Sequence, residues 1–148
     1  MDYRKYGDTY YIRFDRGDEI VRGILEVCSR EKIRSAVYSG IGGCESADIQ
    51  TCNPAERQFD THRVQGMLEL VSMNGNAMLD TEGAYTHHTH AVFSFLEDGV
   101  HRIMAGHVKS AAVLYTAEIE LRPVIGGEIR RSYDKQNRTR FWDFADGQ

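Results

Sequence analysis

The chain has 148 residues, of which 41% are hydrophobic and 27% charged, with 14 glycines and only two prolines. This composition is that of an ordinary folded domain, and a chain of this length can bury a sufficient core without disulfides or a structural metal. The longest unbroken apolar run, residues 111–115, excludes a membrane-spanning helix, which needs roughly 20 residues. We expect one domain over residues 1–148, with its core at about 10–121 and a C-terminal extension at 122–148.

The three cysteines, Cys28, Cys44 and Cys52, are odd in number and show no CxxC spacing. The first residues of the chain lead into no apolar signal region. We therefore expect a reduced, cytoplasmic setting in which the cysteines serve as small core residues.

The formal net charge of −4 would repel a phosphate backbone at long range, so nucleic acid could bind only through a local basic patch. One candidate patch lies near the C-terminus, where basic residues are interleaved with Tyr133, Phe141 and Trp142. The alternative is a solvated tail whose aromatic side chains pack on a neighbouring surface. The candidate nucleic-acid residues are Arg130, Arg131, Arg138 and Arg140, with Lys135 beside them.

Hydrophobic periodicity predicts one helix and many strands. Alternation predicts a strand at 10–15, and a turn and N-cap at Gly17-Asp18 precede a helix from Ile20 to about Lys32. Strands at 35–39 and 47–51 follow. The remaining segments read as strands separated by turn residues, at 59–65, 67–77, 86–95, 101–108 and 112–121. We therefore expect an α+β fold, in which one main helix covers a curved, mostly antiparallel sheet.

The glycine-rich segment 40–43 follows a predicted strand but matches neither the GxGxxG fingerprint nor a phosphate loop ending in Lys-Ser/Thr. It predicts a turn between strands. No GxSxG motif is present, and spacing ties no serine or cysteine to a histidine as a nucleophile.

Five of the six histidines fall between residues 87 and 107. On a strand, side chains alternate between the two faces, so His88 and His90 point the same way and His87 points to the other side. Two imidazoles so placed can bind one metal ion.

A third ligand would have to come from the strand that follows the hairpin at 98–99, which carries His101 and His107. His107 is the better candidate because Gly106 permits a close backbone approach. Three neutral imidazoles would leave an open coordination position, as catalytic zinc sites do, although a cluster of half-buried polar side chains is the alternative. The ligand types also suit copper, iron or nickel.

Glu69 lies in the apolar stretch 67–71, where a carboxylate is costly to bury without a partner. It could serve as a general base, as a partner of a ligand histidine, or as an outward residue at the solvent or a subunit interface. By alternation it shares a face with Met67, Val71 and Met73.

A series of motifs between Tyr10 and Leu121 resembles, in order, the PPC domain (plant and prokaryote conserved domain). The motifs are Arg16-Gly-Asp-Glu-Ile, Ser39-Gly-Ile-Gly, Leu68-Glu-Leu-Val-Ser-Met-Asn-Gly, His88-Thr-His90 and Gly106-His107-Val108.

This resemblance implies an α+β fold with a curved antiparallel sheet, a homotrimer, and a metal, usually zinc, held by His88, His90 and His107. Bacterial members are often labelled as DNA-binding because plant PPC domains accompany AT-hook motifs. This chain has no Arg-Gly-Arg-Pro hook. The PPC fold is also similar to that of acetolactate decarboxylase, which holds zinc by histidines.

Three hypotheses result. The chain is a metal-binding, trimeric PPC module with a DNA-binding or regulatory role, a small zinc-dependent lyase or hydrolase with Glu69 as candidate base, or a purely structural oligomerisation domain. A small-molecule ligand at the metal belongs to the second hypothesis.

Overall fold

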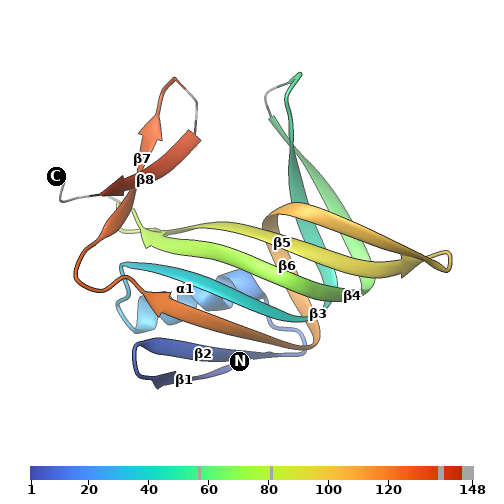
Figure 1. Cartoon of the computed structure of the whole chain (residues 1–148), viewed down its shortest axis with the longest axis horizontal. Coiled ribbons are helices and arrows are strands. Elements are labelled where there is room, and N and C mark those ends of the chain that lie inside the picture. The colour runs from blue at the N-terminus through green and yellow to red at the C-terminus, as the bar shows by residue number, and fades with distance from the viewer. Residues whose placement is uncertain (57, 81, 137–138, 145–148) are drawn as a thin grey trace.

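The computed structural model describes residues 1–56, 58–80, 82–136 and 139–144. These residues form eight strands and one helix (Figure 1). The elements are β1 (Asp2–Tyr6), β2 (Thr9–Asp15), α1 (Ile20–Arg30), β3 (Ser35–Asn53), β4 (Gln58–Leu79), β5 (Tyr85–Glu97), β6 (Val100–Pro123), β7 (Ile129–Asp134) and β8 (Thr139–Phe144).

The main sheet has the strand order β1-β2-β6-β3-β4-β5, and it closes on itself because β5 also pairs with β6. All of these pairings are antiparallel. The closing point is His107 of β6, which is opposite Gln50 of β3 on one edge and His90 of β5 on the other. The sheet therefore has no free edge at this position.

The expected α+β class is wrong: the fold is mostly antiparallel β with a single 11-residue helix among the described residues. The sequence pattern breaks at segment 40–43, at Gly66 and near Ser110, which predicts separate short strands. In the structure each of these breaks lies inside one long strand. Register shifts adjoin all three breaks: between Gly40 and Gly42, at Gly66, and next to Ser110. The chain therefore bulges there and keeps its pairing.

The glycine-rich segment 40–43 is thus part of β3 and not the expected turn. A Cβ atom on Gly40 would lie 2.3 Å from the Glu118 carbonyl oxygen of β6, and one on Gly42 would lie 2.6 Å from the Ala117 Cβ. These glycines allow β3 to pack tightly against β6.

The helix begins after Glu19, whose carboxylate accepts hydrogen bonds from the backbone N–H groups of Val21 (3.2 Å) and Arg22 (2.6 Å). Glu19, and not the expected Asp18, is therefore the N-cap. The same carboxylate accepts from the Ala111 N–H at 2.9 Å, which ties the helix start to the irregular part of β6.

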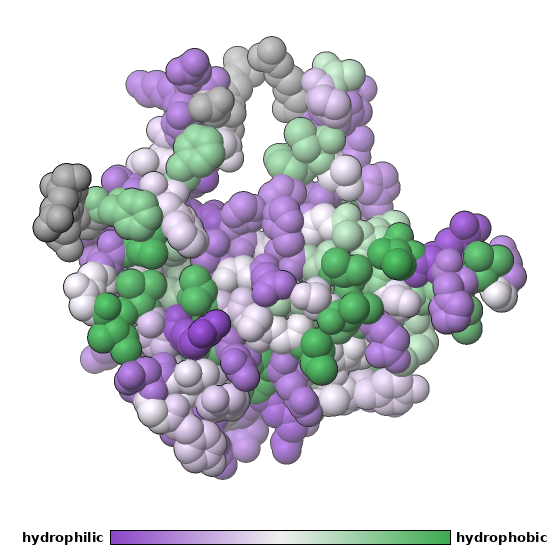
Figure 2. Space-filling model, viewed as in Figure 1, coloured by the Kyte–Doolittle hydropathy of each residue, from purple (hydrophilic) through white to green (hydrophobic). Residues whose placement is uncertain are grey.

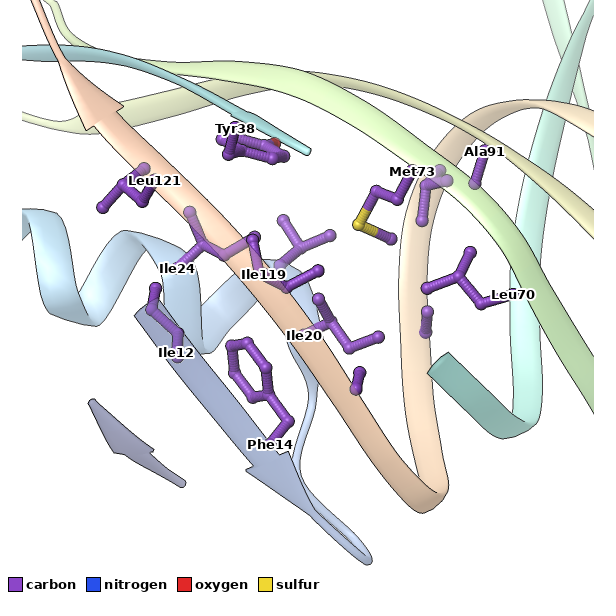
Figure 3. Close-up of a cluster of buried hydrophobic side chains, with 14 of the residues drawn as sticks. Ile12, Phe14, Ile20, Ile24, Tyr38, Leu70, Met73, Ala91, Ile119 and Leu121 are labelled. Carbon is purple, nitrogen blue, oxygen red and sulfur yellow. The ribbon is translucent and has the colours of Figure 1, made fainter. Parts of the chain in front are cut away.

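The core lies between α1 and the sheet. Ile20 and Ile24 of the helix face Phe14 of β2, Ile119 of β6 and Met73 of β4, and all five side chains are at most 2% exposed (Figure 3). Cys28 and Cys44 belong to this core, as expected, whereas Cys52 is exposed. No helix in the described part of the chain is both long and apolar enough to cross a membrane.

Two hairpins project from the same side of the sheet (Figure 1). One is the outer part of the β3–β4 hairpin, residues 46–53 and 58–65, which we call the β3–β4 arm. The other is the separate two-stranded sheet of β7 and β8, which we call the β7–β8 arm. Figure 2 shows an open space between these two arms.

Candidate metal centre

Three histidines meet on the face of the sheet below the two arms. His88 and His90 lie on β5, and His107 lies directly opposite His90 on β6. One ring nitrogen from each of the three lies within 4.8 Å of the others. The structure thus brings together the three residues that alternation, Gly106 and the family resemblance single out.

The donor geometry can be compared with that of a bound zinc ion. The Nε2 atoms of His88 and His90 are 3.2 Å apart. Two ligands of a tetrahedral zinc ion, each at the usual Zn–N length, are separated by about 3.3 Å. The His88 and His107 rings are nearly parallel at a centroid distance of 5.0 Å, and the His90 ring crosses them at 74° and 72°. The three imidazoles therefore fit a transition-metal ion.

Gly106 brings β6 close to β3 at the site. A Cβ atom at this position would lie 2.7 Å from the backbone oxygen of Gln50 and 3.0 Å from Ile49 Cγ2. The expected close backbone approach is therefore present, and it sets His107 beside β3 as well as beside β5.

Two of the three imidazoles have lowered pKa values. Partial burial, together with Arg131 and the neighbouring histidines, lowers the pKa of His88 to about 4, although part of the side chain is exposed. Burial, and then His90, lowers the pKa of His107 as well. Both imidazoles are therefore neutral at pH 7, which is the form that binds a metal.

His87 lies on the other face of β5, as alternation predicts. Its Nδ1 is 2.9 Å from the Thr89 hydroxyl, and Thr89 is also hydrogen-bonded to the hydroxyl of Tyr38. Thr89 and Tyr38 are buried. Thr89 and Tyr38 thus form a buried polar pair to which the partly buried His87 is joined, and burial lowers the pKa of His87.

The other two sequence candidates lie away from the cluster. His101 is exposed and pairs with Leu96, six residues along β6 from His107, a separation of about 20 Å. Glu69 is opposite Ser94, four residues along β5 from His90, or about 13 Å. The structure does not bring Glu69 to the three histidines of the same chain.

Glu69 is instead exposed on an apolar part of the surface. It lines a hollow of about 570 Å³ with the exposed side chains of Ile41, Met67, Val71 and Tyr115. The expectation that Met73 shares this face is wrong, because a register shift between Leu70 and Ser72 turns Met73 into the core.

Two hollows flank the histidines. One, of about 460 Å³, lies between the arms and is lined by His87, His88 and His107 with residues of both arms. The other, of about 500 Å³, is lined by His88 and His90 with Trp142 of β8 and residues of β3 and β4. Both have the size of small-molecule sites.

The described basic residues near the C-terminus have different surroundings. Arg131 turns towards the sheet: its guanidinium donates to the His87 carbonyl oxygen (3.2 Å) and to Asn76 Oδ1 (2.9 Å). Arg130 forms an ion pair with Glu128 at 3.2 Å. Arg140 lines the hollow between the arms. Arg138 lies outside the described residues.

Two further residues, which the sequence pattern does not indicate, adjoin the cluster. Phe59 of the β3–β4 arm contacts His107 edge to face at a centroid distance of 4.9 Å. Asn76 is opposite His88 on β4 and holds Arg131. Both contacts depend on pairing register and arm position, for which the sequence carries no local signal.

The closed β-sheet and its histidine cluster define a small β-rich protein with a candidate metal centre. A family model described as the Plants and Prokaryotes Conserved (PCC) domain matches residues 1–125. The chain therefore belongs to this family, which is also abbreviated PPC, and the resemblance seen in its motifs is confirmed.

Solved structures agree with this assignment. A PPC protein from Pyrococcus horikoshii is 27% identical, with a TM-score of 0.80 over 96% of this chain and 94% of that one. A protein from Archaeoglobus fulgidus described as metal-containing is 26% identical, with a TM-score of 0.80 over 96% and 98%. A candidate DNA-binding protein from Bacteroides thetaiotaomicron shares the fold at 24% identity, with a TM-score of 0.86 over 97% and 96%. No curated protein matches the chain.

Proposed function

We propose that this chain is a homotrimeric, metal-binding PPC module. Each chain would hold one transition-metal ion, for which zinc is the expected identity, through His88, His90 and His107. The observation that carries the proposal is the convergence of three imidazole nitrogens within 4.8 Å. The metal-containing relative from Archaeoglobus fulgidus supports it. When bound, such an ion acts as a Lewis acid with an open position for a further ligand.

A role in small-molecule binding follows from the surroundings of this open position. Two ligand-sized hollows adjoin the histidines, and among the described residues neither is lined by an aspartate or glutamate. The alternative, a zinc-dependent lyase or hydrolase, needs a general base beside the metal, and Glu69 of the same chain lies elsewhere. We therefore favour ligand binding, in a regulatory role, over hydrolysis.

Elemental analysis of the purified, zinc-reconstituted protein tests the metal site. We expect one zinc per chain in the wild type and almost none in His88→Ala, His90→Ala or His107→Ala. His101→Ala, which removes an exposed histidine from the same strand as His107, and His87→Ala, on the other face of β5, should retain the metal. Circular dichroism should show that all five variants remain folded, because none of the five histidines belongs to the hydrophobic core.

Retention of zinc by His88→Ala together with its loss from His87→Ala would contradict the ligand set, because it would place the binding face on the wrong side of β5.

The proposed trimer is supported by the apolar surface around Glu69. Ile41, Met67, Val71 and Tyr115 are 45–65% exposed and lie together on the side of the sheet that α1 does not cover. Large exposed apolar patches mark interaction sites. Light scattering at micromolar concentration should give the mass of three chains, and Val71→Arg should shift it towards one. A wild-type monomer would contradict the proposal.

A further inference from the structure

The hollow between the two arms carries positive charge. Lys109 of β6, Arg131 of β7 and Arg140 of β8 line it, and no acidic residue of the described chain does so. The whole chain has a formal net charge of −4. The fold therefore concentrates cations beside the histidines of an otherwise acidic protein, which raises the local concentration of anions.

Among the residues that the structure describes, Arg131 has no counter-charge. Its two hydrogen-bond acceptors, the His87 carbonyl oxygen and Asn76 Oδ1, are neutral. Its Nε atom is buried and has no partner among the described residues, which also provide no ion pair to this guanidinium. A partly buried charge without compensation is costly, and an anion in the hollow would supply the compensation.

Arg140 adds a second guanidinium to the same wall. It lies on β8 opposite Tyr133, two residues from the Arg131–Trp142 pair of the same ladder. Burial is the main cause that lowers the pKa of Arg131. The charge of Arg140 lowers this pKa further, as expected for two cations at close range. Paired arginines are the usual donors to carboxylate and phosphate oxygens.

His88 and His107 line this same hollow of about 460 Å³, so a molecule inside it can contact both the arginines and the open position of a metal. We propose that the hollow between the arms binds a small molecule with a carboxylate or phosphate group, whose oxyanion is held by Arg131 and Arg140. This inference rests on the proposed metal site for the second contact of the ligand, and it names the chemical class of that ligand.

Titration of the zinc-loaded protein with malonate and with inorganic phosphate tests the inference. Calorimetry gives the affinity, and the emission of Trp142, the single tryptophan of the chain, reports on the adjoining hollow. Malonamide, which has the size of malonate without its charge, is the matched ligand control. The malonate and phosphate titrations show which oxyanion is preferred.

The decisive variant is Arg140→Gln, because this exposed side chain has no hydrogen bond within the described residues that its replacement would break. We expect it to weaken anion binding at least tenfold while the zinc content stays at one per chain. Arg130→Gln is the matched control: it removes the same charge from the same arm, at a residue that pairs with Glu128, and should leave the affinity within about twofold.

Three results would overturn the inference. The first is an equal anion affinity of Arg140→Gln and the wild type. The second is equal binding of malonamide and malonate. The third is binding of a single-stranded oligonucleotide without binding of either small anion. If the wild type holds no zinc but binds an anion through Arg140, the metal function fails and the anion site stands, so the two failures are distinguishable.

Discussion

The two faces of strand β5 differ in chemistry although their residues alternate one by one. The outward face carries His88 and His90, which meet His107 in an open cluster. The inward face carries Thr89, Ala91 and Phe93, which are buried. One strand therefore serves as both scaffold and site, so stability and metal binding should respond to different substitutions.

The largest expected effect is on the inward face. Phe93 is fully buried, and Phe93→Ala should lower the free energy of unfolding by about 3–5 kcal/mol. His90→Ala in the metal-free protein should change it by about 0.5 kcal/mol or less, because the side chain is exposed. Urea denaturation of chelator-treated protein measures both, and similar losses would remove the distinction between the faces.

The polar network of the inward face should give the next largest effect. Thr89→Val leaves the buried Tyr38 hydroxyl without its partner and should cost about 1–3 kcal/mol. Thr116→Val is the matched control, since the Thr116 hydroxyl is buried without a hydrogen-bond partner in the described chain, and it should be neutral or stabilising. If Thr89→Val also empties the metal site, the two faces are coupled.

The outward face should make the free energy of unfolding of the metal-free protein depend on pH. The pKa of His88 is about 4 in the folded state and near 6.5 in an unfolded chain. As the pH falls from 6.5 to 4, the unfolded state binds a proton that the folded state does not, so the free energy of unfolding should decrease across this window. His88→Ala should flatten this decrease, and chemical denaturation at several pH values measures it.

Metal release should follow the same pKa values. Because those of His88 and His107 are both lowered, protons compete with the metal at a lower pH than for ordinary histidines, whose pKa is near 6.5. We therefore expect zinc to stay bound at pH 6 and to dissociate towards pH 4, as measured by a chromophoric chelator. Complete loss at pH 6 would contradict this.

The smallest effect is expected for DNA. Arg130 pairs with Glu128, and Arg131 turns inward to line the hollow between the arms, so neither is presented to an extended phosphate backbone. We expect random duplex DNA to bind with a Kd of about 10 µM or weaker at physiological salt. A nanomolar, salt-dependent complex that is abolished by replacing Arg130, Arg131, Arg138 and Arg140 would instead establish direct DNA binding.

The sequence predicts those features of the structure whose signals lie close together in the chain. Alternation places His87 and His88 on opposite faces of β5, and Gly106 indicates the close strand that carries His107, because both signals are local. The turn residues Gly7-Asp8, which join β1 to β2, are a local signal of the same kind.

Bulges and arms were not predictable in the same way. A bulge has the sequence pattern of a strand end, so the pattern predicts several short strands where the structure has one long strand. The pattern therefore understates how much of the fold is β. A register shift after Leu70 likewise reversed the expected face of Met73. The position of Arg131 beside His87 depends on how the β7–β8 arm packs against the sheet. This packing is a tertiary contact, for which the local sequence carries no signal.

The closing of the sheet at His107 has a consequence for engineering. Because β6 is paired on both edges there, the backbone that presents the donor atoms is fixed by strand pairing and not by the donors. The side chains at 88, 90 and 107 can therefore be replaced without a change in the backbone that carries them. Replacing His107 by aspartate or cysteine should change which metal is preferred, towards harder or softer ions, without redesign of the protein around it.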